Sequence, residues 1–497
     1  MKYAHSIITV LGIATFLGGI STPVWAQTDS TQAETPVQAE ASAPQVSPVE
    51  LYNRGVEKAK KQKYAEAITD FDQAIQIDPE FAEAYLYRGA ALARLGDQAG
   101  AIANFNQAIQ LRPTYAEAYF NRGDAYYDLG NYEAALADFT QAIQLKPDYS
   151  EAYVYRGVAE TSLNSRRDNS DVAAQSIRIN PAFMVASEGK QQSVLEDFTE
   201  AISIKPDYAQ AYAHRGATRI ALGNHEAAVT DFDQAIQLQP DYTEAYLNRG
   251  IAHYNLGLNQ AALADLDEAI DLDDESAPAY LNRGIVRSAQ GSQFAALEDF
   301  NQAIELQPRY IEAYLSRGMF FSFQGNQRGA IADFNRAISL QPDYTEAYKN
   351  RADVRLILDD AEGAVADYSE AILLDLDYAE AYKGRGDAHN ALGEQQNALA
   401  DYSQAIQLDP SYIAAYEERG NIFSERGNTQ RAFEDYTQVL LADPLNADVY
   451  YNRAVIRARQ GDRAGAIADF QQAANLYLQK GMADGYRDVI SAVNNLQ

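Results

Sequence analysis

Apolar and small residues recur along most of this chain in a helical pattern that regular turns interrupt. In segment 82–115 the first half predicts a helix that ends at Gly96, a residue suited to the left-handed end of a helix. Asp97 can then cap the next helix by accepting its free backbone N–H groups, and Pro113 prevents that helix from continuing. The apolar residues of this second helix are spaced i, i+1, i+4, i+7 and i+8, on one helix face: Ala101, Ile102, Phe105, Ala108 and Ile109. We therefore predict an antiparallel helical hairpin.

This hairpin recurs with a period of 34 residues, and an arginine marks every copy. Gly follows the arginine in ten of the twelve copies; Ala352 and Ala454 are the exceptions. A repeat array suits a chain of 497 residues because each unit buries its apolar face only against its neighbours. The marking arginines are Arg54, Arg88, Arg122, Arg156, Arg215, Arg249, Arg283, Arg317, Arg351, Arg385, Arg419 and Arg453. Only the interval between Arg156 and Arg215 is longer than the rest.

The repeated pattern is A-x-Y-x-x-R-G…L-G…A-I-x-D-F-x-x-A-I-x-L-x-P, and it runs from about Val49 to Leu478. It resembles the tetratricopeptide repeat family, here in an exported, bacterial-type protein with many repeats. The second-helix aromatic is replaced only at Leu266, and the closing Pro is missing only at Asp274, at Leu376 and in the last copy. The resemblance implies an all-α fold, an α-solenoid of twelve helix-turn-helix repeats that forms a right-handed superhelix. The first helices would line its concave groove.

The repeated arginine stands where the family pattern usually has leucine, and it has a candidate partner. Asp precedes the second-helix aromatic in eleven copies, and Asn104 replaces it in one. We predict a ladder of ion pairs between the two helices of each hairpin. The alternative is a stripe of arginines that grips anionic ligands, but repetition in every copy favours a structural role. The aspartates are Asp70, Asp138, Asp197, Asp231, Asp265, Asp299, Asp333, Asp367, Asp401, Asp435 and Asp469.

Function in a repeat protein is expected where the copies differ, and the resemblance implies that ligands contact the exposed face of the first helices. That face is apolar and aromatic in several central copies, and it carries lysine with Asp353 and Asp387 in the ninth and tenth. Aromatic and Met side chains suit a binding groove. The alternative is that these residues only pack against the adjacent hairpin. The predicted partner-binding residues are Phe120, Asp124, Tyr127, Leu247, Ile251, Tyr254, Leu281, Ile285, Leu315, Met319, Phe323, Lys349 and Lys383.

The fourth copy holds an insertion at about 162–187. It contains Arg166, Arg167 and Arg178, a local excess of positive charge on an acidic protein. Loops accept insertions easily because the entropy of closure grows slowly with loop length. Both a tolerated decoration and a partner-binding projection remain open as interpretations of this segment.

The charge balance excludes two classes of partner. The formal net charge is −30, from 70 acidic and 40 basic side chains. Such a surface repels nucleic-acid phosphates and anionic lipid headgroups, so we expect protein or peptide partners instead. The chain contains no Cys and therefore has no disulfide, thiolate nucleophile or thiolate metal site.

The N-terminus has the order of a cleaved export signal over residues 1–26. Lys2 is followed by an uncharged run over 7–20, and small residues precede a cut after Ala26. The run is shorter than the ~20 residues that span a bilayer, although a retained N-terminal anchor is the alternative. We therefore expect a periplasmic or extracellular protein without an integral membrane span. Residues 27–48 predict a disordered linker, 49–478 the repeat array, and 479–497 a helix that caps the exposed end of the stack.

The usual signatures of catalysis are missing. No two of the five histidines have metal-ligand spacing on one helix face, and no phosphate loop, nucleophile elbow or H-E-x-x-H motif occurs. We expect no enzyme activity, no cofactor and no metal site. The leading hypothesis is an exported, non-catalytic scaffold that binds protein or peptide partners in its concave groove and serves in complex assembly. The alternative is a structural or glycan-associated envelope spacer whose groove binds no ligand.

Overall fold

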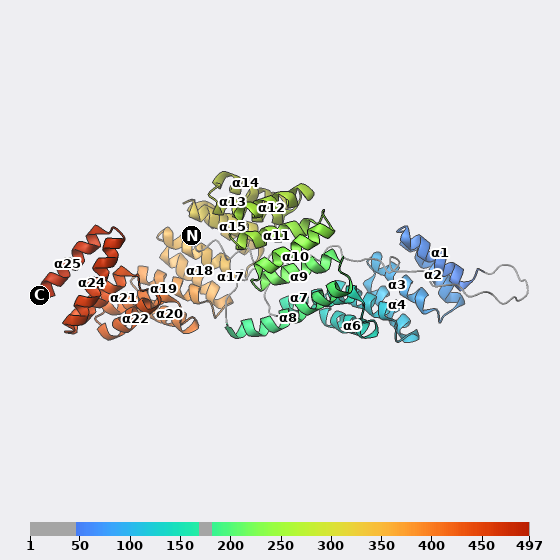
Figure 1. Ribbon diagram of the computed structural model, residues 1–497, viewed down its shortest axis with the longest axis horizontal. Coiled ribbons are helices and arrows are strands. Elements are labelled where there is room, and N and C mark those ends of the chain that lie inside the picture. The colour runs from blue at the N-terminus through green and yellow to red at the C-terminus, as the bar shows by residue number, and fades with distance from the viewer. Residues whose placement is uncertain (1–45, 168–180, 497) are drawn as a thin grey trace, which may run out of the picture. The chain divides into compact units, whose positions relative to one another are not determined.

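The computed structural model describes residues 46–167 and 181–496. Over these ranges the chain forms twelve successive helix pairs and one final helix, α25 (Ala483–Leu496) (Figure 1). The first helices of the pairs are α1 (Pro48–Lys60), α3 (Ala82–Arg94), α5 (Ala116–Asp128), α7 (Ser150–Arg167), α9 (Ala209–Ala221), α11 (Thr243–Asn255), α13 (Ala277–Ala289), α15 (Ile311–Phe323), α17 (Thr345–Ile357), α19 (Ala379–Ala391), α21 (Ile413–Glu425) and α23 (Ala447–Arg459). The second helices are α2 (Tyr64–Ile77), α4 (Gln98–Leu111), α6 (Tyr132–Leu145), α8 (Pro181–Ile204), α10 (His225–Leu238), α12 (Asn259–Leu272), α14 (Gln293–Leu306), α16 (Gln327–Leu340), α18 (Ala361–Leu374), α20 (Gln395–Leu408), α22 (Thr429–Ala442) and α24 (Arg463–Gln479). The predicted fold class, an all-α solenoid of helix-turn-helix repeats, is confirmed.

The turn inside each hairpin follows the predicted punctuation. Gly96 has a φ of +85°, and the N–H of Asp97 donates to the carbonyl of Leu92 at 3.0 Å, which closes the end of α3. The carboxylate of Asp97 then accepts from the backbone N–H of Gly100 at 2.9 Å and caps α4. In the first and ninth copies Gln62 and Asp359 adopt the same left-handed conformation without glycine.

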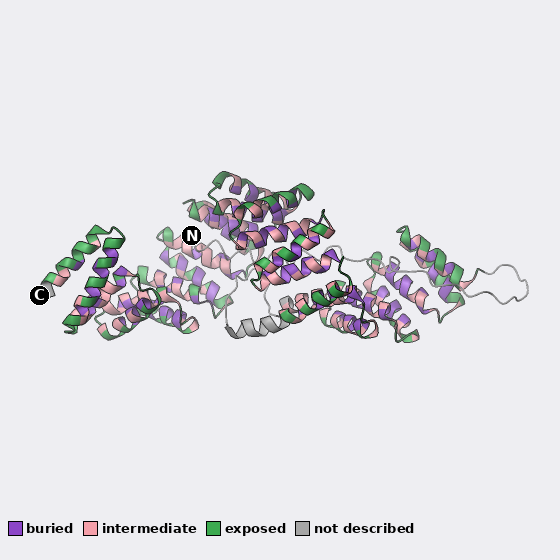
Figure 2. Cartoon of the chain, in the orientation of Figure 1, coloured by how far each residue is buried: buried purple, intermediate pink, exposed green. Residues whose placement is uncertain are grey.

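The core of each hairpin is centred on the second-helix aromatic, which is fully buried in most copies. The glycine after the repeated arginine makes room for this ring. A Cβ added to Gly123 would lie 2.8 Å from Cε1 of Phe139, closer than carbon atoms pack, so the ring in this copy would have to shift to accept any larger residue. Buried residues accordingly run along the facing sides of the paired helices (Figure 2).

The chain divides into two compact units. The first ends at Gln307 and contains α1 to α14; the second begins at Pro308 and contains α15 to α25. Within each unit a second helix packs against the first helix of the next pair, as α2 does against α3 and α18 against α19. Each hairpin therefore buries its apolar surface against its sequence neighbours, as a solenoid requires.

The fourth pair and the two ends depart from the regular repeat. α7 has 18 residues where the other first helices have 13, and α8 has 24 where most second helices have 14, so the described part of the predicted insertion extends these two helices. At the start of the array Ser47 caps α1 together with Glu50, and at its end α25 buries Val489 against α24. The predicted signal and most of the predicted linker lie outside the described residues. No helix in the described ranges is both long and apolar enough to cross a bilayer.

Candidate partner-binding site

The predicted ion-pair ladder is present in every copy that has its aspartate. In the third copy the Arg122 guanidinium donates to both oxygens of Asp138, at 2.7 and 2.6 Å. The same pairing joins Arg351 to Asp367 at 2.6 Å. In the second copy, where the aspartate is missing, Arg88 donates to Oδ1 of Asn104 at 2.7 Å instead. The ladder prediction is therefore confirmed.

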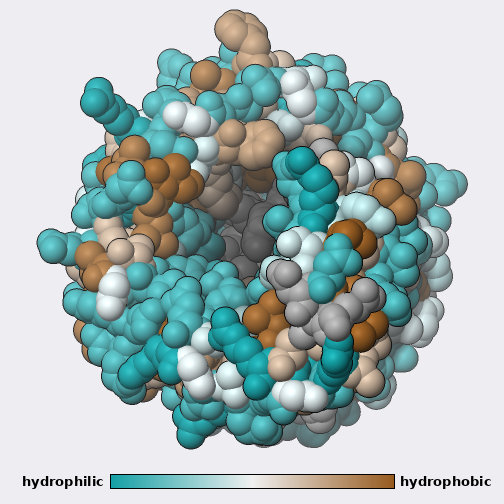
Figure 3. All heavy atoms as spheres, turned by 90° about the vertical axis from the view of Figure 1, so that its left-hand side faces the viewer, coloured by the Kyte–Doolittle hydropathy of each residue, from teal (hydrophilic) through white to brown (hydrophobic). Residues whose placement is uncertain are grey.

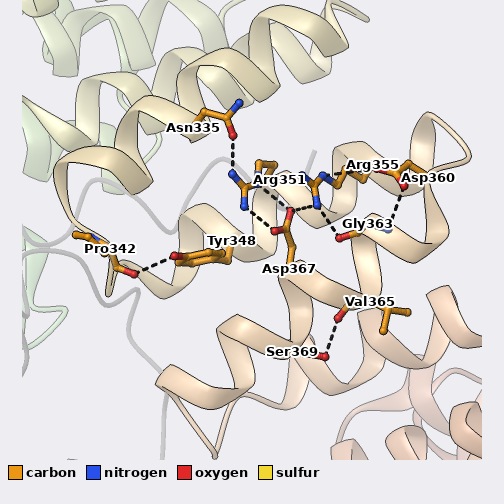
Figure 4. A network of polar contacts seen from close by, with 10 residues as sticks. All are labelled: Asn335, Pro342, Tyr348, Arg351, Arg355, Asp360, Gly363, Val365, Asp367 and Ser369. Atoms are coloured by element: carbon orange, nitrogen blue, oxygen red, sulfur yellow. Dashed lines mark hydrogen bonds and ion pairs between the residues drawn. The ribbon is translucent and has the colours of Figure 1, made fainter.

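Most of these arginines also donate a hydrogen bond to the second helix of the preceding hairpin, a contact that the 34-residue pattern did not predict. Nη1 of Arg351 donates to Oδ1 of Asn335 on α16, and Arg249 pairs in the same way with Asp233 on α10 (Figure 4). Because one guanidinium joins two hairpins, its donors are already occupied by the scaffold. The arrangement favours the structural role of this stripe over the gripping of anionic ligands.

In many copies a second basic side chain, four residues after the repeated arginine, also contacts the aspartate. Arg355 contacts the other oxygen of Asp367 at 3.1 Å, and Lys58 contacts Asp70 at 2.7 Å (Figure 4). Burial acts to raise the pKa of Asp70, but the hydrogen bonds from Arg54 and Lys58 outweigh it and lower that pKa. These aspartates are buried, and the bidentate pairing compensates the lost hydration of their carboxylates.

We use the name first-helix face for four positions of each first helix, counted from the repeated arginine. These are the position two residues before it and the positions two, five and six residues after it. All thirteen predicted partner-binding residues lie at these positions. The expectation that this face is exposed was wrong for seven of them, which are buried within the chain: Phe120, Leu247, Ile251, Tyr254, Leu281, Ile285 and Leu315.

The burial has a simple cause in the packing of neighbouring hairpins. The ring of Phe120 lies 5.0 Å from that of Tyr149 and 5.1 Å from that of Tyr155, both from the next copy. Residues two before the arginine thus serve the contact between successive hairpins. For these side chains the alternative interpretation holds, namely that they pack against the adjacent hairpin. They are too buried to form a contact surface for a partner.

Other residues of the first-helix face in the second unit are accessible. Phe323 is 83% exposed, and Ile357, which has the same register in the next copy, is 60% exposed. Met319, two residues after the repeated arginine on α15, is partly buried. Viewed from the C-terminal end, hydrophilic side chains cover most of the visible surface and apolar residues form separate patches (Figure 3). Because Phe323 is so exposed, its side chain contributes little to folding.

The two predicted lysines lie on the same face but are engaged within the chain. Lys349 pairs with Asp353 at 2.7 Å and Lys383 with Asp387 at 2.6 Å, each one helical turn apart. The hydroxyl of Tyr402 donates to the other oxygen of Asp387 at 2.9 Å. These pairs keep the lysine heads partly exposed, so they can still contribute charge to a surface.

The hydrogen bond from this tyrosine hydroxyl to the first helix is a feature that the sequence pattern did not predict. Tyrosine replaces phenylalanine in the second helices of copies nine to eleven, and its hydroxyl donates to the residue two after the arginine: Asp353, Asp387 or Asn421. The other copies have an apolar residue there, with the exception of Asp124. The joint change of these two positions within one chain was a signal that could have revealed the link.

Asp124 and Tyr127 lie on the first-helix face of the third copy, in the first unit. Burial, together with the nearby charge of Asp128, raises the pKa of Asp124 to about 7, although Arg94 acts in the opposite direction. Tyr127 hydrogen-bonds Ser162 on α7 across 3.0 Å. Burial also raises the pKa of the Tyr127 hydroxyl, to about 12.

The cationic residues of the insertion are placed only in part. Arg166 and Arg167 end α7, and their side chains are not described; Arg178 lies outside the described residues. Among the residues that the structure does describe, no group of three or more His, Asp or Glu side chains is arranged to hold a metal ion.

Comparison with known families gives consistent matches along the chain. Models described as TPR repeat match residues 55–96, 89–130, 218–257 and 386–427. Models described as tetratricopeptide repeat match residues 116–149, 418–480, 243–276 and 311–344. Together these matches cover more than half of the chain. No curated protein sequence matches it.

Several solved structures are similar in fold. Yeast Tom70 is 17% identical with a TM-score of 0.43, covering 90% of this chain and 95% of its own. The APC/C hetero-tetramer Cut9–Hcn1 is 14% identical with a TM-score of 0.45, covering 90% of this chain and 99% of its own. A tetratricopeptide repeat protein from Parabacteroides merdae is 20% identical with a TM-score of 0.43, covering 55% of this chain and 99% of its own.

Proposed function

Because the chain belongs to the tetratricopeptide repeat family, whose members are generally non-catalytic interaction modules, we propose that it is an exported scaffold that binds protein or peptide partners on its first-helix face. The observation that carries the proposal is the pair Phe323 and Ile357. Both are strongly exposed and in the same register of adjacent first helices, α15 and α17, which contact each other. Exposed apolar side chains aligned in this way suit the anchors of a partner.

Charged residues on the same face support the same function. Lys349 lies about two helical turns before Ile357 on α17, and Lys383 has the same register on α19, each with its aspartate partner. A polar rim beside an apolar contact is the usual composition of a non-obligate protein interface. We place the protein outside the cytoplasm on the pattern of residues 1–26, with cleavage after Ala26.

Crosslinking tests the proposed surface. The full exported chain is treated with a lysine-reactive crosslinker in its native envelope, and the products are mapped by mass spectrometry. We expect partner crosslinks at Lys349 and Lys383, and their loss in a Phe323→Ala, Ile357→Ala double variant. Phe294 is the matched control, since it is 76% exposed but lies at the start of the second helix α14, away from the first-helix face.

The outcomes separate the two functions that the sequence left open. Crosslinks that persist in the double variant, or that are lost equally in Phe294→Ala, contradict binding at this surface. A chain that yields no protein crosslinks at all supports the spacer alternative. Export is tested separately by tryptophan fluorescence, because Trp25 is the only tryptophan and lies before the predicted cut. An indole signal from the mature protein would contradict cleavage there.

A further inference from the structure

Among the described residues, Asp124 is the one acidic residue of its register without a hydrogen bond or ion pair. At the equivalent position Asp353 accepts from Tyr368 and pairs with Lys349, and Asp387 is held in the same way. In the third copy the second-helix aromatic is Phe139, which has no hydroxyl, and Phe120 stands where the lysine would be. Within the described residues no hydrogen bond or ion pair reaches the Asp124 carboxylate.

The surroundings of Asp124 come from three successive copies. Asp128 and Tyr127 lie on its own helix, Tyr149 and Tyr155 belong to the next copy, and Arg94 ends α3 of the preceding copy. Asp128 accepts a hydrogen bond from Gln98 at 2.7 Å and is otherwise exposed. The position therefore combines two carboxylates, one helical turn apart, with Tyr127 on the same helix, and Arg94 is the one cation that acts on both carboxylates among the described residues.

Such a surface is complementary to a cation on a partner. A lysine or arginine head would give Asp124 the charged hydrogen bond that Lys383 gives Asp387, and the partly exposed ring of Tyr127 could contact its apolar stem. The chain as a whole carries a net charge of −30, which attracts basic segments to it. Burial makes the ionised form of Asp124 less favourable and raises its pKa to about 7. Pairing with a cation of the partner would offset this cost of ionisation.

We propose that the first-helix face of the third copy binds a basic peptide segment of a partner, with Asp124 pairing with a lysine or arginine side chain. This proposal rests on the proposed function and names the chemistry of one of its partners.

Binding of a defined probe tests it. The probe is a fluorescein-labelled lysine-rich peptide, with the same peptide carrying glutamine in place of lysine as its control, and the full mature chain is titrated by fluorescence anisotropy. We expect Asp124→Asn to weaken binding of the lysine peptide about tenfold, as for the loss of one charged hydrogen bond. Asp387→Asn removes the same charge in the same register, and we expect less than about a twofold change because its carboxylate is already paired.

The pH dependence gives a second readout. The lysine peptide should bind the ionised carboxylate, so its affinity for the unmodified chain should fall as the pH drops from 8 to 6, through the pKa of about 7. The affinity of Asp124→Asn should stay nearly constant over that range. Equal weakening by both asparagine variants would show only general attraction to an acidic surface and would overturn the proposal.

One further variant tests whether the site is filled by the chain itself. Arg166, Arg167 and Arg178 are changed together to glutamine. Unchanged affinity for the lysine peptide supports an external partner, whereas clearly tighter binding would mean that the arginines of the insertion occupy Asp124 and would contradict the proposal. If the peptide fails to bind Asp124 while the crosslinks at Lys349 and Lys383 still depend on Phe323, only this inference is lost and the proposed function stands.

Discussion

The third and the tenth copies are the same hairpin with one change in chemistry. Both have the arginine–aspartate pair, Arg122 with Asp138 and Arg385 with Asp401, at 2.6 and 2.8 Å. Both also carry an aspartate two residues after the arginine. In the tenth copy a tyrosine hydroxyl and a lysine hold that aspartate, and in the third copy nothing in the described chain does.

The difference shows how the copies keep a common scaffold while the chemistry of the first-helix face varies. The buried pair, the glycine and the ring are common to both copies and fix the hairpin. A single hydroxyl, present on Tyr402 and absent from Phe139, then helps to decide whether a carboxylate on the first-helix face is used inside the chain or remains available. The chemistry of the surface can therefore change between copies without a change in fold.

The largest expected effect concerns the part that the two copies share. Asp138→Ala and Asp401→Ala should each lower local stability by about 2–3 kcal/mol, below the full value for a buried pair because the arginines stay partly exposed. Hydrogen exchange of α5–α6 and of α19–α20 in the full chain measures the loss. Asp72→Ala, at an exposed pair with Arg88, is the control and should cost less than about 1 kcal/mol. A loss no larger than this control would contradict a structural role for the ladder.

Replacing the aspartate two residues after the arginine should change stability in opposite directions in the two copies. Asp387→Ile leaves Lys383 and the Tyr402 hydroxyl without their acceptor and should destabilise α19–α20 by about 2 kcal/mol. Asp124→Ile removes an unpaired, partly buried carboxyl and should stabilise α5–α6 by about 1 kcal/mol. Isoleucine is a fair replacement because Ile251 and Ile285 occupy this register in other copies. Equal signs in the same exchange experiment would remove the distinction between the copies.

A smaller effect isolates the hydroxyl. Tyr402→Phe should destabilise α19–α20 by about 1 kcal/mol, since Asp387 loses one hydrogen bond but keeps Lys383. Tyr382→Phe is the control in the same copy, because its ring lies over Arg385 and its hydroxyl makes no hydrogen bond in the described part of the chain. The account would be weakened if both substitutions gave the same change.

The fold and the ladder were accessible from sequence because both follow from local spacing. A 34-residue period fixes which arginine meets which aspartate, and glycine marks each turn. The solvent exposure of the first-helix face could not be predicted in this way. Phe120 is buried by Tyr149 and Tyr155 of the next copy, a contact that depends on how successive hairpins pack. The same packing hides Leu247 and Leu281, whereas Phe323 remains exposed.

The most direct test of the central claim is the stability of Asp124→Asn relative to the unmodified chain as a function of pH. The pKa of Asp124 is raised to about 7 in the folded chain from its ordinary value near 4, so ionisation costs stability progressively as the pH rises from about 4 to about 7. Hydrogen exchange of α5, corrected for the intrinsic rate at each pH, should show Asp124→Asn to be more stable at pH 8. The advantage should shrink as the pH falls to 5.5. An advantage that is constant with pH, or a loss of stability at pH 8, would show that burial does not penalise an unpaired Asp124 carboxylate and would contradict the account.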